Sequence, residues 1–96
     1  SIITESIMEQ MRQEMRATNL EKIYWIHDAG LPEDELFDPF TSTKPHQSFY
    51  ITEEGKLVIV FDEYEVAPGY MGIVEFEIPT ELLADVLVSN EYIQNN

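Results

Sequence analysis

The 96-residue sequence contains no cysteine, which excludes a disulfide scaffold, a cysteine-ligated metal and a thiol nucleophile. This absence does not fix the compartment, because exported and cytosolic proteins alike can lack cysteine. The sequence also lacks a run of about 18 apolar residues, so no part of it is expected to enter a membrane. Its start lacks the basic and then apolar regions of a signal peptide, although an anchor or signal upstream of Ser1 is left open.

Basic residues are scarce. Nineteen Asp and Glu face five Lys and Arg, which gives a formal net charge of −14 and a pI near 4.1. From His46 onward the only basic residue is Lys56, against ten acids between Glu53 and Glu91. Such a chain repels phosphate backbones and anionic lipid, so nucleic acid is not expected as a partner. Solubility alone explains an acidic surface, and the sharper alternative is that the second half attracts a basic partner.

Signatures of catalysis are also missing. The two histidines, His27 and His46, show no metal-ligand spacing, and no Gly-x-Ser-x-Gly elbow, glycine-rich phosphate loop or EF-hand pattern occurs. Carboxylate pairs such as Asp62 and Glu65 arise by chance in so acidic a chain. The sequence therefore predicts a protein that is not an enzyme and that needs no cofactor or metal.

Length and composition predict a single domain over residues 1–96, since 44% of the residues are apolar and chains this short rarely form two cores. The first residues already fall within a helical pattern. The chain is therefore expected to be a fragment of a larger domain, with further strands upstream of it.

An amphipathic helix is predicted at the start, because apolar residues recur at four-residue spacing: Ile3, Ile7, Met11 and Met15, with Met8 beside them. Core packing is favoured over an adaptable methionine surface for this stripe. Asn19 suits a cap at either end of a helix. Residues 20–26 fit a short helix or a strand equally well, and a helical first turn is expected after Pro32.

The second half predicts strands. Residues 48–52 and 57–61 flank a turn at Gly55 and indicate a β-hairpin. The continuous apolar run of 57–61 predicts a central strand covered on both faces. Residues 73–78 alternate as a half-exposed strand, and a short helix is expected to begin at Thr80 with an apolar face made of Leu82, Leu83, Val86 and Leu87. We therefore predict an α+β fold, with an N-terminal helix and a short C-terminal helix packed on a small, mostly antiparallel sheet.

The connection over residues 62–73 is acidic and aromatic, unlike a short strand-to-strand turn. Constrained tyrosines are frequent binding anchors, because they bury a large area at low entropic cost. Tyr64 is expected to pack beneath the loop, whereas Tyr70 and Met71 are expected to project from the surface. The predicted partner-binding residues are Tyr64, Glu65, Pro68, Gly69, Tyr70 and Met71.

Residues 49–83, "FYITEEGKLVIVFDEYEVAPGYMGIVEFEIPTELL", also carry a family resemblance. The hairpin, the Tyr-Glu-x-Ala-Pro loop and the Ile-Pro stop before a helix resemble a bacterial domain. That domain occurs in the extracellular half of RsiV-type anti-sigma-V factors and beside PdaC-type peptidoglycan deacetylase domains. Where many members have Pro followed directly by Tyr, Gly69 intervenes here before Tyr70.

The resemblance implies an α+β fold and a receptor role. RsiV-type proteins are membrane-anchored, hold a sigma factor on the cytoplasmic side and bind C-type lysozyme outside. Binding exposes them to regulated proteolysis, which frees the sigma factor for envelope-stress genes. This implies a sensor module on the extracellular or cell-wall side of a bacterial membrane, with a basic protein, C-type lysozyme, as its partner. A basic partner of this kind agrees with the charge argument for the acid-rich second half of the chain.

Two alternatives to the receptor are left open. In the first, the domain is a non-catalytic peptidoglycan-associated module that accompanies a polysaccharide deacetylase, with Tyr70, Trp25 and Phe40 as stacking platforms for sugars. In the second, the domain is a plain structural subdomain, which requires a buried loop.

Overall fold

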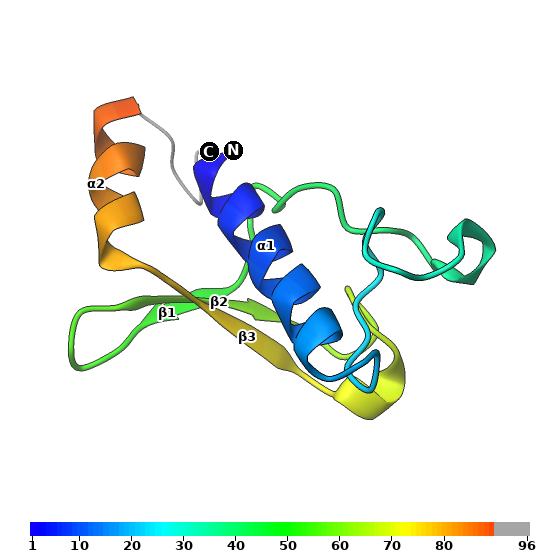
Figure 1. The fold of residues 1–96 in the computed structure, drawn as a ribbon. Coiled ribbons are helices and arrows are strands. Elements are labelled where there is room, and N and C mark those ends of the chain that lie inside the picture. Colours follow the sequence, from blue (N-terminus) through cyan, green and yellow to red (C-terminus); the bar gives the residue numbers. More distant parts are fainter. Residues whose placement is uncertain (90–96) are drawn as a thin grey trace.

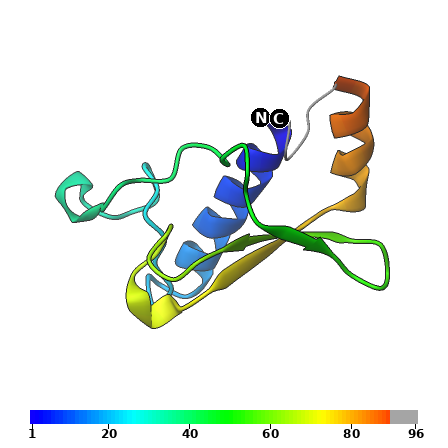
Figure 2. The same cartoon turned by 180° about the vertical axis from the view of Figure 1, so that it is seen from behind.

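The structure, a computed structural model, describes residues 1–89, and of residues 85–89 the backbone alone. The elements run α1 (Ile2–Ala17), η1 (Glu33–Glu35), β1 (Phe49–Ile51), β2 (Leu57–Phe61), η2 (Gly69–Met71), β3 (Val74–Ile78) and α2 (Thr80–Ser89), where η denotes a 3₁₀ turn. Both α-helices lie on one side of the sheet (Figure 1), and the view from behind shows the same single helical layer (Figure 2). The predicted α+β fold is confirmed.

The first helix, α1, has defined signals at both ends. At its start, the Ser1 hydroxyl accepts a hydrogen bond from the Thr4 amide at 3.1 Å, which satisfies one of the free N–H groups of the first turn. At its end, Asn19 and Leu20 adopt left-handed φ angles of 53° and 67°, and the Leu20 amide donates to the Met15 carbonyl at 2.8 Å. The predicted apolar stripe is buried, which confirms its role in the core: Ile3, Ile7, Met11 and Met15.

Residues 20–26 form neither the helix nor the strand that their pattern allowed. Instead, the Trp25 amide donates to the Val66 carbonyl at 2.8 Å, and the Trp25 carbonyl accepts from the Phe40 amide at 2.7 Å. These two long-range bonds satisfy the Trp25 backbone without regular structure, while its neighbours Tyr24 and Ile26 point into the core. The helical turn expected after Pro32 is present as η1.

The three strands form one antiparallel sheet in the order β1-β2-β3. Ile59 of β2 lies between Phe49 of β1 and Phe76 of β3, so the predicted hairpin and the central position of β2 are confirmed. On the face away from α1, the strands carry an ion pair and a hydrogen bond between side chains, Lys56–Glu77 at 3.5 Å and Tyr50–Glu75 at 2.6 Å. Val58, paired between Tyr50 and Glu77, is buried on that face, so β2 is covered on both sides as expected.

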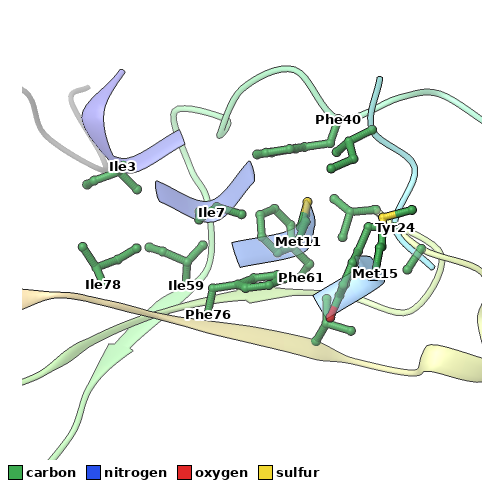
Figure 3. Close-up of a cluster of buried hydrophobic side chains, with 14 of the residues drawn as sticks. Ile3, Ile7, Met11, Met15, Tyr24, Phe40, Ile59, Phe61, Phe76 and Ile78 are labelled. Carbon is green, nitrogen blue, oxygen red and sulfur yellow. The ribbon is translucent and has the colours of Figure 1, made fainter. Parts of the chain in front are cut away.

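The core lies between α1 and the sheet (Figure 3). Phe61 packs edge-on against Phe40 and Phe76, with ring centroids 5.4 and 6.0 Å apart. Leu82 and Leu83 of α2 pack against this cluster and stay partly exposed. The expected apolar contribution of Val86 and Leu87 lies outside the described residues.

Candidate functional site

The connection between β2 and β3, residues 62–73, opens with a closed turn. The Glu65 amide donates to the Asp62 carbonyl at 3.0 Å, and the Asp62 amide donates to the Glu65 carboxylate at 2.9 Å. The Lys44 ammonium lies 3.9 Å from the other carboxylate oxygen of Glu65. Glu65, predicted to contact a partner, therefore has its carboxylate held within the turn, where it sets the loop geometry.

The middle of the loop is anchored in the protein. Val66 and Ala67 are buried in the core cluster, and the Val66 carbonyl accepts the Trp25 amide described above. Both residues follow β2 without continuing it, as the sequence predicted. A buried middle between exposed ends gives the loop a fixed shape, since an irregular segment keeps one conformation when its backbone and apolar groups are satisfied.

Tyr64 is 63% exposed, so the prediction that it packs beneath the loop is wrong. Its backbone has a left-handed φ of 68°, a conformation that costs energy for a residue with a Cβ. The Tyr64 ring lies against Gly69, where a Cβ would overlap the ring atoms. Gly69, which precedes Tyr70, thus makes room for the Tyr64 ring on the outside of the loop.

Tyr70, in the turn η2, is 66% exposed, as predicted. Its hydroxyl donates to the Glu21 carbonyl at 2.8 Å, which ties the loop to the segment after α1. Pro68 begins the turn, and its carbonyl accepts the Met71 amide at 3.0 Å. The prediction that Met71 projects from the surface is wrong, because the side chain lies partly buried against the core.

The structure adds an aromatic residue that sequence reasoning missed. Phe37 is 68% exposed, and its ring packs edge-on against Trp25 with centroids 5.4 Å apart. Because Trp25 pairs with the loop backbone at Val66, this aromatic pair belongs to the segment that adjoins the loop. The available signal was an aromatic residue in an acidic segment, next to Asp38 and outside any periodic apolar pattern. Ile73, at the end of the loop, is also exposed.

One expected sugar platform is absent from this surface. Phe40 is 6% exposed, with its ring packed on Phe61, so the prediction that it stacks on a sugar is wrong. Trp25 is partly buried between the core and Phe37. Tyr70 is the single member of the predicted sugar-stacking set whose ring is mostly exposed.

The region is strongly acidic. Residues 20–38 and 62–73, the two segments joined by the Trp25–Val66 and Tyr70–Glu21 bonds, contain nine acids and one lysine. His27, in the first of these segments, has its Nδ1 2.7 Å from a Glu33 carboxylate oxygen. We define the candidate docking face as the exposed side chains of these two segments, which combine aromatic rings with a negative field.

The described part of the chain holds no group of three or more His, Asp or Glu arranged to bind a metal ion. Within the same residues, no helix is both long and apolar enough to cross a bilayer.

The chain is similar to a known protein family and to a known protein. Residues 1–81 match the family described as "Protein of unknown function (DUF3298)". Over 93 residues, the chain is 50% identical to "Anti-sigma-V factor RsiV" of Bacillus subtilis (strain 168). That alignment covers 97% of this chain and 30% of the relative, so the chain spans about a third of the relative's length.

Proposed function

Since the chain belongs to the DUF3298 family and is an RsiV-type domain, we propose that it is the sensor module of an anti-sigma factor. In this proposal the module lies on the extracellular or cell-wall side of a bacterial membrane, within a membrane-anchored protein. It binds a basic protein, a C-type lysozyme, and binding triggers regulated proteolysis that releases a sigma factor. The module itself is not catalytic.

The observation that carries the proposal is the pair of exposed rings, Tyr64 and Tyr70, on a loop whose middle is buried. Rigid aromatic side chains lose little conformational entropy on binding, and they dominate the energetics of many interfaces. A loop held by Val66, Ala67 and the Glu65 turn presents these rings without a further ordering cost.

The charge of the docking face supports the choice of partner. Nine acids against one lysine produce a negative field, which speeds encounter with a basic protein and disfavours acidic competitors. The exposed acids of the docking face should raise the association rate, whereas the tyrosine rings should lengthen the residence time of the complex. This division predicts that salt and aromatic substitution weaken binding through different rate constants.

The glycan-binding alternative has less support. Sugar stacking needs an open aromatic platform, and Phe40 is buried. The acids of the docking face also favour a cationic partner over a neutral glycan.

The test is a calorimetric titration of the chain with hen-type lysozyme at low and at high salt, with basic cytochrome c as a control of similar charge. We expect lysozyme binding that weakens steeply with salt, together with much weaker binding of cytochrome c. Tyr70→Ala should weaken lysozyme binding, whereas Tyr50→Ala, which removes an exposed tyrosine on the sheet face away from α1, should not. No lysozyme binding at low salt, or equal binding of both basic proteins, would contradict the proposal.

A further inference from the structure

The edge of the sheet at β1 carries open backbone groups. The Ser48 carbonyl accepts the Val60 amide at 3.0 Å, and the Thr52 amide donates to the Lys56 carbonyl at 2.8 Å. In an antiparallel ladder, successive residues point their N–H and C=O groups alternately toward and away from the neighbouring strand. The backbone groups of Phe49 and Ile51 therefore point away from β2, and none of the described atoms of residues 1–89 pairs with them.

The opposite edge of the sheet, at β3, has a backbone group that is paired. By the same alternation, Glu77 of β3 points its carbonyl outward, and the Gln10 side-chain amide of α1 donates to that carbonyl at 3.0 Å. Proteins commonly cover or block exposed strand edges, because an open edge templates the addition of another strand. Among the residues that the structure describes, a helix side chain blocks the β3 edge, whereas no group covers the β1 edge.

The side chains beside the open edge are apolar. Phe49 pairs with Ile59 and Ile51 with Leu57, so both lie on the face of the sheet that carries α1. Ile51 is 56% exposed and Phe49 is also exposed, unlike their buried partners on β2. A strand added at this edge would place its own apolar side chains against Phe49 and Ile51 and bury them, since directly opposed residues share a face.

We propose that the open edge of β1 is a second docking site, which takes an extended basic peptide segment as a fourth, antiparallel strand. Alternate residues of such a segment would be apolar and face Phe49 and Ile51. The intervening basic residues would lie on the opposite face beside Tyr50, close to the acidic turn of Glu53 and Glu54 that follows β1. Main-chain hydrogen bonds supply affinity in this mode of recognition, and alternate side chains supply specificity.

Charge selects this occupant over a second copy of the chain. Each copy has a formal net charge of −14, so pairing two β1 edges would bring like charges together. A basic segment removes that repulsion. The site lies at the hairpin end of the sheet, whereas the loop with η2 lies at the other end (Figure 1), so this inference does not depend on the proposed function.

The test uses a synthetic probe, acetyl-Lys-Val-Lys-Ile-Lys-Val-Lys-amide, titrated into the 96-residue chain by calorimetry. Two further versions of the probe carry N-methyl groups, either on the Val and Ile amides or on the three Lys amides that follow them. In antiparallel addition the Val and Ile residues oppose Phe49 and Ile51 and donate to β1, so their methylation should weaken binding about tenfold or more. Methylation of the Lys amides, which point away from β1, should leave affinity unchanged.

Two variants of the chain complete the test. Ile51→Pro removes the outward N–H without removing a bond to β2, a position where an edge strand accepts proline. It should weaken binding of the unmethylated probe about tenfold, whereas Ile51→Thr, which keeps the N–H, should weaken it less. An amide spectrum of each variant confirms that the sheet is intact, and probe binding should slow hydrogen exchange at Phe49 and Ile51.

Three results would overturn the inference. Equal binding of all three probes would show attraction by charge alone. Loss of binding on Lys methylation, with Val and Ile methylation tolerated, would exclude the antiparallel register. A dimer that forms through β1 in the absence of probe, detected by sedimentation equilibrium and abolished in Ile51→Pro, would make a second copy the occupant.

Discussion

The ring of Tyr64 occupies the space beside Gly69 that a Cβ at position 69 would need. This contact joins the first turn of the loop to η2, and so places the two exposed tyrosines of the docking face in a defined relation. The left-handed backbone of Tyr64 is part of the same arrangement, because it directs the ring outward and over the glycine. The glycine at position 69 thus has a local structural reason.

Gly69→Ala should displace the Tyr64 ring and weaken lysozyme binding. Because Tyr64 is exposed, its ring can swing into solvent, so the free energy of unfolding should change by no more than about 1 kcal/mol. Binding and urea unfolding of the single variants and of the double variant with Tyr64→Ala form a thermodynamic cycle. Contacting residues couple by about 0.5 kcal/mol or more, so Gly69→Ala should have little effect on binding once the ring is gone. An equal loss in both backgrounds would mean that position 69 acts through the backbone alone.

Tyr70→Ala should weaken lysozyme binding by about 2 kcal/mol, the loss typical of an aromatic anchor, and lower the free energy of unfolding by about 1 kcal/mol or less. Tyr70→Phe separates the two roles of the side chain, because it keeps the ring and removes the hydrogen bond to the Glu21 carbonyl. We expect intermediate binding for the phenylalanine variant. If Tyr70→Ala unfolds the chain instead, the loop belongs to the core and the site assignment fails.

Alkaline pH should expose the role of Tyr24. Burial, together with a hydrogen bond of 2.6 Å to Glu14, raises the pKa of the Tyr24 phenol well above its usual range. The unfolded chain therefore loses this proton first, near pH 10. The stability contribution of Tyr24 is complete below about pH 10 and is lost as the pH rises above it. Urea unfolding between pH 7 and pH 11.5 should show a shallower alkaline loss for Tyr24→Phe than for the wild type.

The stability at pH 7 and a second tyrosine variant serve as controls for the Tyr24 prediction. At pH 7, Tyr24→Phe should cost about 1 kcal/mol, the net value of one hydrogen bond. Tyr50→Phe is the matched control, because its hydrogen bond to Glu75 also raises the pKa of the Tyr50 phenol, but on the surface. Because solvent screens this exposed pair, Tyr50→Phe should reduce the alkaline loss less than Tyr24→Phe does. Parallel profiles for the wild type and Tyr24→Phe would contradict the prediction.

The sequence predicted those elements in which the spacing of apolar residues shows which face is buried. The alternation of apolar and acidic residues identified β3, which buries every second residue, and a four-residue apolar repeat identified the stripe of α1. The structure of residues 20–26 could not be predicted in this way. Long-range backbone hydrogen bonds to Val66 and Phe40 determine their conformation, and the periodicity of the sequence does not reveal such bonds. For this reason a segment with two plausible regular structures has neither.

The sequence likewise predicted some features of the loop and not others. The exposure of Tyr70 followed from the sequence, since the neighbouring strands already supply enough apolar side chains for the core. The exposure of Tyr64 and the partial burial of Met71 did not, because both depend on local backbone conformations such as the left-handed φ of 68° at Tyr64. Those conformations arise from the closed turn and from η2, which become visible only in three dimensions.

Phe61→Ala should separate folding from recognition. Phe61 lies at the end of β2, fully buried between Phe40 and Phe76, and the loop begins at the next residue. Truncating a buried aromatic leaves a cavity and costs about 3–5 kcal/mol, a large part of the stability of a domain this small. Phe37→Ala is the matched control, because it removes the same side chain from the surface and should cost about 1 kcal/mol or less.

Urea unfolding and lysozyme titration of both variants provide the comparison. Phe61→Ala should lose stability, and it should lose binding only in proportion to the fall in the folded population. Adding a stabilising osmolyte, which raises the folded population, should therefore restore binding. Phe37→Ala should keep its stability, and any loss of affinity then measures a direct contact of the docking face. A stable Phe61→Ala variant would show that β2 is not the centre of the core. Normal affinity in Phe37→Ala would confine the binding surface to the loop that carries Tyr64 and Tyr70.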